Sequence, residues 1–139
     1  MEPYCILTLD SDSLDRQFRV GALVIGCALF VGLYYLGAQP FAVGLLVPPY
    51  DKLAHFTLFF VLASLFWLAA GGRWSILIFL VVAGLGALDE WHQAYLPGRA
   101  VDVVDFLTDT TAAACAITWL HWRRRQRNAG IVQGEHDGQ

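Results

Sequence analysis

The stretch WSILIFLVVAGLGALDEWHQAYLPGRAVDVVDFLTDTTAAACAITWL (residues 74–120) contains two apolar runs joined by a polar connection. A helix needs roughly 20 predominantly apolar residues to cross a hydrocarbon core of about 30 Å. The first run reaches this length only if its helix continues through Asp89 to about Leu96, whereas the second run covers residues 101–122. Backbone groups in lipid must be satisfied within the segment, and neither run alternates like a barrel strand. The stretch therefore predicts two membrane-spanning helices.

Two further apolar runs precede this stretch, at residues 18–37 and 53–70. The short Gly-Gly-Arg connection at residues 71–73 predicts that the second and third helices are antiparallel neighbours. The connection at residues 39–50 contains three prolines, which favour a non-helical segment on the membrane surface. We therefore expect an all-α polytopic membrane protein, a bundle of four transmembrane helices.

The composition supports a single membrane domain. The chain has 139 residues, of which 57% are hydrophobic and 15% are charged, whereas charged residues make up roughly a quarter of a soluble chain. The charges are bunched, which excludes a disordered chain and a basic face for nucleic acid. The three cysteines, Cys5, Cys27 and Cys115, form no C-x-x-C pair, so neither a disulfide framework nor a thiolate zinc site is expected.

Basic residues predict the orientation of the bundle. With four spans both termini share one side, and that side would hold seven arginines: Arg16, Arg19, Arg73, Arg123, Arg124, Arg125 and Arg127. Only Lys52 and Arg99 fall on the opposite, outer side, so the positive-inside rule places both termini in the cytoplasm. We divide the chain into a cytoplasmic segment (residues 1–17), a transmembrane domain (18–122) and a cytoplasmic tail (123–139), basic at first and then disordered.

Ionisable side chains gather on the predicted outer side. Each costs about 2.5 to 3.5 kcal/mol near the bilayer centre, so such residues are functional candidates. Asp51 and His55 share one face of the second helix, and Asp89 and Gln93 share one face of the third. Three aspartates spaced three and four residues apart line one face of the fourth helix: Asp102, Asp105 and Asp109. These faces can converge on one cavity.

A simpler role is available to two of the acids. Asp51 and Asp102 each stand at a predicted helix start, where a carboxylate caps backbone N–H groups and favours the positive end of the helix dipole. Capping does not explain Asp89 or Glu90, which lie within a helix and need partners to offset desolvation. Six acids also greatly outnumber the two nearby bases, Lys52 and Arg99.

Four motifs occur in a fixed order. They are DKLAH (residues 51–55), DEWHQ (89–93), PGR (97–99) and Asp105. This order resembles the VanZ-like family, with its pattern D-K-x-x-H, D-E-x-x-Q, P-G-R and a following D. The chain departs from that pattern at Asp109, where the family commonly has Asn, and at Ala112, where it has Gly. The family is named for a protein that lowers susceptibility to the glycopeptide teicoplanin, so the resemblance implies a protein of the bacterial inner membrane and cell envelope.

The sequence leaves three functions open. In the first, the outer cavity binds the head group of an envelope glycolipid, a peptidoglycan precursor or a glycopeptide, with Lys52 and Arg99 gripping anionic groups. We assign that site to eight residues: Asp51, Lys52, His55, Asp89, Glu90, Gln93, Arg99 and Asp105.

The second function is a metal-dependent hydrolase or transferase acting on a lipid-linked substrate. A divalent ion would then be held by His55 together with carboxylates from Asp51, Asp89, Glu90, Asp105 or Asp109. The third function is a structural or assembly subunit with a membrane-protein partner or a second copy of the chain. The sequence does not decide whether the protein is an enzyme, and we assign no metal ligand and no cofactor from it.

Overall fold

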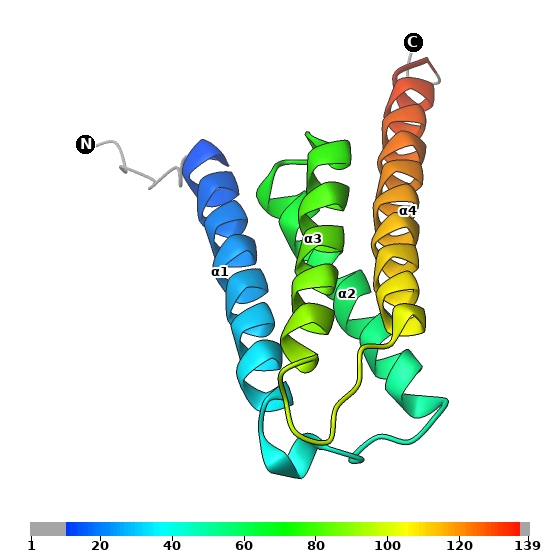
Figure 1. The fold of residues 1–139 in the computed structure, drawn as a ribbon. Coiled ribbons are helices and arrows are strands. Elements are labelled where there is room, and N and C mark those ends of the chain that lie inside the picture. The colour runs from blue at the N-terminus through cyan, green and yellow to red at the C-terminus, as the bar shows by residue number, and fades with distance from the viewer. Residues whose placement is uncertain (1–10, 137–139) are drawn as a thin grey trace, which may run out of the picture.

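The computed structural model describes residues 11–136, and the side chains of residues 15–127. Four α-helices and one short 3₁₀ helix occur in this part of the chain: α1 (Ser11–Gly37), η1 (Pro40–Ala42), α2 (Tyr50–Ala69), α3 (Ser75–Gln93) and α4 (Val103–His136) (Figure 1). All four α-helices are long and apolar enough to cross a membrane, and the described residues contain no strand. The predicted all-α bundle of four membrane-spanning helices is confirmed.

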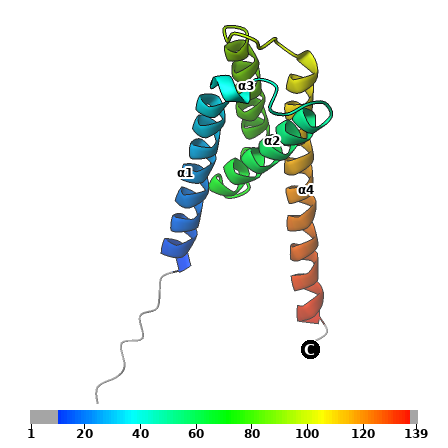
Figure 2. The same cartoon turned by 90° about the horizontal axis from the view of Figure 1, so that it is seen from below.

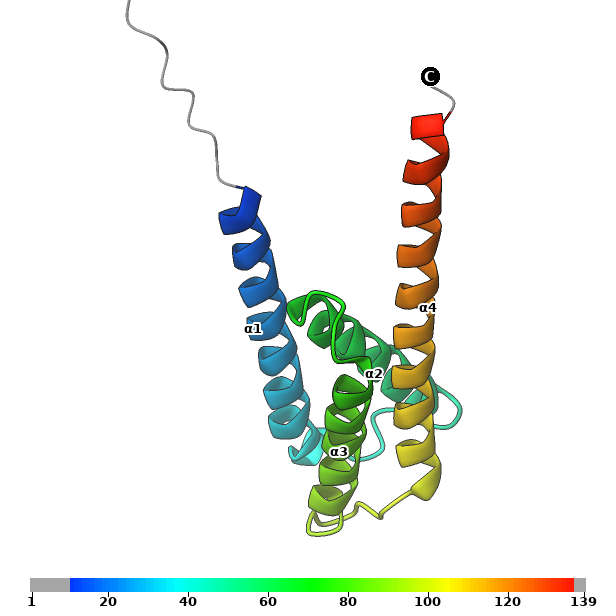
Figure 3. The ribbon, with the colours of Figure 1, turned by 90° about the horizontal axis from the view of Figure 1, so that it is seen from above.

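The helices alternate in direction. Both long connections, residues 38–49 and 94–102, lie at one end of the bundle, which we call the loop end (Figure 1). The start of α1, the α2–α3 turn and the end of α4 lie toward the opposite, terminal end. Figures 2 and 3 show α2 inclined to the other helices, with α2 and α3 between α1 and α4. Because α2 packs against all three other helices, it is the central element.

The core lies where α2, α3 and α4 meet. Phe59 and Leu62 on α2 and Val82 on α3 are fully buried. They pack near three alanines of α4, Ala112, Ala113 and Ala116, which are also fully buried. Small side chains let helix backbones approach closely in lipid, where the hydrophobic effect does not drive helices together. Ala114, which belongs to the same run of alanines, is exposed.

Polar contacts tie the helices together at the terminal end. Trp67 Nε1–H donates to Ser75 Oγ at 3.2 Å, and Ser75 Oγ lies 2.6 Å from His121 Nε2. Arg124 of α4 also donates to the carbonyl of Gly72 at 3.1 Å, and Arg19 of α1 to that of Ala69 at 3.0 Å. These contacts join all four helices around the α2–α3 turn.

Three element boundaries differ from the sequence prediction. The connection expected to be non-helical contains the 3₁₀ turn η1, because Pro40 at its start has the backbone angle that a helix needs. The third helix ends at Gln93 rather than near Leu96. The backbone of α4 remains helical to His136, whereas a disordered tail was expected from residue 128. Extending a formed helix costs much less than nucleating one, which accounts for this continuation.

Candidate polar cavity at the loop end

A cavity of about 220 Å³ opens at the loop end between α1, α2, α3 and both connections. Five of the eight predicted site residues line it: Asp51, His55, Asp89, Gln93 and Arg99. Three leucines supply apolar walls, Leu33 from α1, Leu58 from α2 and Leu96 from the second connection, and residues of the first connection also lie against the cavity. Lys52, Glu90 and Asp105 complete the predicted set through contacts described below.

Lys52 forms an ion-pair cluster that joins α2 to the start of α4. Its ammonium lies 2.5 Å from Asp102 Oδ2, 2.5 Å from Asp105 Oδ1 and 3.4 Å from Asp51 Oδ2. Asp102 also caps α4, since its Oδ1 accepts the Val104 N–H at 2.8 Å. The capping role weighed from the sequence thus holds for Asp102, but α2 has no side-chain cap. The three carboxylates leave Lys52 little capacity for an external anion.

The Lys52 hydrogen bond, reinforced by the Val104 N–H, holds the pKa of the Asp102 carboxyl below its ordinary value of 3.8. A lowered pKa means that this group contributes to stability above pH 3.8 and stops doing so as the pH falls through the lowered value. The Asp102 carboxyl of the cluster is therefore ionised at neutral pH.

Arg99 binds backbone rather than carboxylates. Its Nη2 donates to the carbonyl of Gly37 at 3.2 Å and to that of Ala42 at 3.0 Å. These contacts fasten the end of α1 and η1 over the cavity. The sequence predicts that Arg99 grips an anion; in the structure its Nη2 secures the first connection, and its buried Nε has no partner among the described residues.

His55 pairs with Asp109, a residue outside the predicted site. His55 Nδ1 lies 3.0 Å from Asp109 Oδ1, and Asp109 is fully buried. The second oxygen, Oδ2, has no hydrogen-bond partner among the described residues. Gly86 makes room for this carboxylate, since a Cβ at position 86 would lie 3.2 Å from Asp109 Oδ2. The spacing of the three aspartates predicts that Asp109 shares a face of the fourth helix with Asp105, but it does not predict that His55 is its partner.

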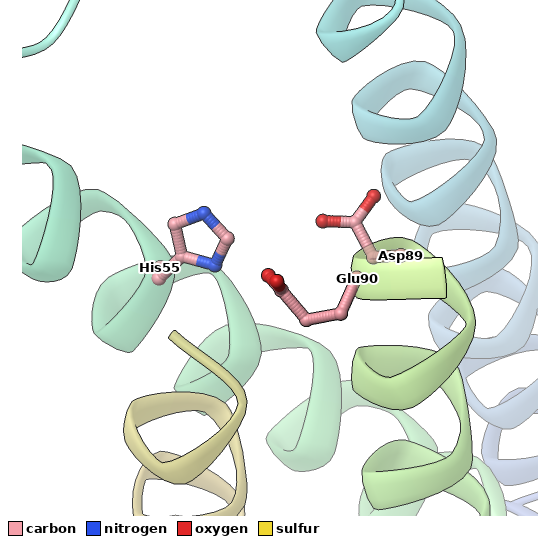
Figure 4. Close-up of side chains that lie close together, drawn as sticks. All are labelled: His55, Asp89 and Glu90. Atoms are coloured by element: carbon pink, nitrogen blue, oxygen red, sulfur yellow. The ribbon is translucent and has the colours of Figure 1, made fainter. Parts of the chain in front are cut away.

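Asp89 and Glu90 are neighbouring acids buried at the end of α3, with exposed fractions of 4% and 5%. Gln93 donates to Asp89 Oδ2 at 2.9 Å, and the Asp102 backbone N–H donates to Glu90 Oε2 at 2.8 Å. Glu90 Oε1 has no partner among the described residues. Figure 4 shows Glu90 extending from α3 toward His55, with the Asp89 carboxylate beside it. One ligand atom from each of these three residues lies within 4.8 Å of the others.

His92 has a contact that the sequence did not indicate. Its ring stacks on Tyr34 of α1 with the ring centroids 3.8 Å apart, and His92 also lines the cavity. The two residues are far apart in the chain, and no local spacing relates them. The stack joins α1 to α3 beside the cavity.

The charges divide into two groups. Three acids surround Lys52. Among the described residues, no lysine or arginine forms an ion pair with Asp89, Glu90 or Asp109, whose side-chain neighbours are His55 and Gln93. Burying carboxylates without compensation is costly, so this second group requires protonation, a bound cation or donor groups of a ligand. The cavity consequently offers carboxylate acceptors, together with the buried Nε of Arg99, which has no partner among the described residues.

Comparisons with known proteins agree with this architecture. The family model described as VanZ/LLP1 matches residues 13–124, which include the first three spans, the whole loop end and all but the last three residues of the fourth span. An uncharacterized protein of Schizosaccharomyces pombe is 33% identical over 131 residues, covering 88% of this chain and 78% of that protein. No solved structure matches the chain. The multi-pass membrane protein described here therefore belongs to the VanZ/LLP1 family.

Proposed function

We propose that the loop-end cavity binds the polar head group of an amphiphilic envelope molecule, a glycolipid or a lipid-linked sugar precursor, from the outer face of the membrane. The observation that carries this proposal is the two-sided lining of the cavity, with leucine walls and a polar floor that includes His55, Asp89 and Gln93. Ligand sites commonly combine apolar walls with a few placed polar groups. An amphiphile at a membrane interface has matching chemistry.

The cavity volume limits what can enter. Sites for drug-sized ligands measure about 300 to 1,000 Å³, whereas this cavity measures about 220 Å³. It suits one sugar ring or a group of similar size, with the rest of the ligand outside. A glycopeptide such as teicoplanin would insert only a substituent, and a role in teicoplanin resistance would require that contact.

The available groups favour hydroxyl or amino groups over phosphate. Lys52 is committed to three carboxylates, and the Arg99 guanidinium donates to two backbone carbonyls. Asp89 and Glu90 retain acceptor capacity, and carboxylates form strong hydrogen bonds with donors of this kind.

A metal-dependent hydrolase or transferase is a second candidate function. The specific observation in its favour is the cluster of His55, Asp89 and Glu90, whose ligand atoms lie within 4.8 Å of one another. Such a cluster beside a head-group cavity would place an ion next to a bound lipid-linked substrate. Product formation by purified protein would separate this function from binding alone.

A plug in the cavity tests head-group binding without changing any charge. Ala54 on α2 lines both the cavity and a shallow apolar groove beside it, whereas its neighbour Leu53 is 61% exposed and lines the groove but not the cavity. We expect Ala54→Trp to lower retention of a glucosyl- or glucosaminyl-bearing lipid by at least about tenfold, the equivalent of 1.4 kcal/mol. Native mass spectrometry of full-length protein in lipid, with phosphatidylglycerol as the competitor, measures this retention.

Leu53→Trp is the matched control, because it adds the same ring about 100° around α2, at a position that does not line the cavity. It should retain the lipid as wild type does. Equal retention by both variants, or no preference of the wild type over phosphatidylglycerol, would contradict the proposal. A parallel titration with teicoplanin determines whether a glycopeptide competes for the same cavity.

We also propose that both termini are cytoplasmic and that the loop end faces outward. The seven arginines named above flank the spans toward the terminal end, as the positive-inside rule requires of a cytoplasmic side. In a cysteine-free background, a membrane-impermeant maleimide should label Ala100→Cys from outside and Arg125→Cys only after permeabilisation. Labelling of both positions from one side would refute the four-span topology, and the reversed pattern would invert the orientation.

A further inference from the structure

Three side chains form a cluster beside the cavity, of which His55 and Asp89 line the cavity floor and Glu90 lies next to them. His55 comes from the second turn of α2, and Asp89 and Glu90 come from the last turns of α3. Their ligand atoms lie within 4.8 Å of one another, and both acids are more than nine-tenths buried. Two carboxylates this close repel each other in a site of low dielectric, unless something positive lies between them.

We infer that His55, Asp89 and Glu90 bind a divalent transition-metal ion at the cavity floor. Ligand distances of about 2.0 to 2.6 Å place two ligands of one ion up to about 4 to 5 Å apart, which matches the observed spacing. Glu90 Oε1 points independently to a ligand, because it is buried, has no partner among the described residues and belongs to a side chain directed at His55 (Figure 4).

Each of the three ligands is held in place by a second group. Asp109 pairs with His55 Nδ1 at 3.0 Å, Gln93 donates to Asp89 at 2.9 Å, and the Asp102 backbone N–H donates to Glu90 at 2.8 Å. Outer partners of this kind orient the ligands in most metal sites and fix the histidine tautomer.

The donor atoms favour Zn²⁺ or Mn²⁺. Oxygen donors alone suit Mg²⁺ or Ca²⁺, whereas an imidazole nitrogen shifts the preference toward transition metals. A divalent ion would also offset the charge of the acids that Lys52 does not reach. His55 lines the cavity, and Asp89 does too, so the ion would be accessible from it.

The inference concerns the same cavity as the proposed function, but it depends only on the ligand geometry. It also adds a prediction that the proposed function does not make, namely that the protein carries metal without any lipid ligand. If the second candidate function is correct, this ion is the one it requires. Head-group binding and metal binding can therefore succeed or fail separately.

Metal binding is tested on the full-length protein in detergent after treatment with a chelator. Zn²⁺ is titrated in competition with a coloured chelator, Mn²⁺ binding is followed by electron paramagnetic resonance, and Mg²⁺ is the contrasting ion. We expect a single Zn²⁺ or Mn²⁺ to bind the wild type. Glu90→Gln should weaken binding by at least about 100-fold, because even outer-shell substitutions cost about 10- to 100-fold.

Asp102→Asn is the matched control, since it removes a neighbouring charge but keeps the backbone N–H that holds Glu90. The Asp102 side chain is 43% exposed, so its loss should change affinity by less than about fivefold. Asp89→Asn gives a second isosteric test if Glu90→Gln does not fold. The metal site would be overturned if the wild type bound neither Zn²⁺ nor Mn²⁺. It would also be overturned if Asp102→Asn lost as much metal affinity as Glu90→Gln, or if Glu90→Gln and Asp89→Asn both bound metal as the wild type does.

Two further measurements distinguish this failure from failure of the proposed function. Ala54→Trp leaves the three ligands in place, so it should still bind metal while losing the lipid. Lipid retention by chelator-treated wild type, together with no metal uptake, would leave head-group binding standing and reject the metal. Metal uptake without preference for any glycosylated lipid would support the metal site and reject the proposed ligand class.

Discussion

Replacing Lys52 by Met should lower the free energy of unfolding by about 3 kcal/mol. The ammonium contacts Asp51, Asp102 and Asp105, and no other lysine or arginine pairs with these acids among the described residues. Removing one partner of a buried ion pair costs about 3 to 5 kcal/mol, because it leaves charge uncompensated. The Lys52 side chain is 26% exposed, so the lower end applies. Unfolding in sodium dodecyl sulfate, followed by circular dichroism, measures the change.

Two variants control for causes other than charge. Lys52→Arg keeps the cation and should cost less than about 1 kcal/mol, which is the range of a partly exposed pair. Lys52→Met combined with Asp105→Asn should recover part of the loss, because the two residues interact and their effects do not add. Wild-type stability in Lys52→Met would show that the acids are neutralised by another route.

Gly86→Leu should separate α3 from α4 and displace the buried carboxylate of Asp109, which pairs with His55. A Cβ at this position would lie 3.2 Å from Asp109 Oδ2 and 3.4 Å from Phe59, and both residues are fully buried. Overpacking a filled core costs about 1 to 3 kcal/mol, and a buried carboxylate cannot move into solvent to make room. We expect this loss in the same denaturation assay, with weaker binding of metal and lipid.

Gly84 provides a close control on the same helix. A Cβ at position 84 has no atom within 4 Å, so Gly84→Leu points into open space. It should change stability by less than about 0.5 kcal/mol, apart from the small gain expected when glycine leaves a helix interior. If both leucines were equally harmless, α3 and α4 would not pack as closely as described.

The spans and the gathering of polar residues could be predicted from the sequence because both depend on local patterns. Hydropathy over about 20 residues identifies a span, and a spacing of three or four places side chains on one helix face. The Asp51 and His55 pair and the Asp89 and Gln93 pair each share a face, and the structure brings both to one cavity. The Gly-rich turn at residues 71–73 likewise predicted adjacent helices.

The partners within the cavity could not be predicted, because they depend on the register between helices. Nothing local pairs Lys52 with Asp102 and Asp105, which lie 50 and 53 residues away. Arg99 donates to two backbone carbonyls, and because every residue has such an acceptor, the sequence does not indicate which ones it reaches. The tilt of α2 is a packing result, and it determines which acids reach His55 and which reach Lys52.

The long separation between Lys52 and its acids has a consequence for biosynthesis. The ribosome incorporates Lys52 50 residues before Asp102 and 53 residues before Asp105. Until then Lys52 has only the weaker contact with Asp51, so its ammonium must remain in the hydrated lipid-head region while the nascent chain grows. Translation of α4 supplies the counter-charges, and α2 can then settle into its final tilt. We therefore expect the Lys52 ion-pair cluster to form only after the start of α4 has been synthesised.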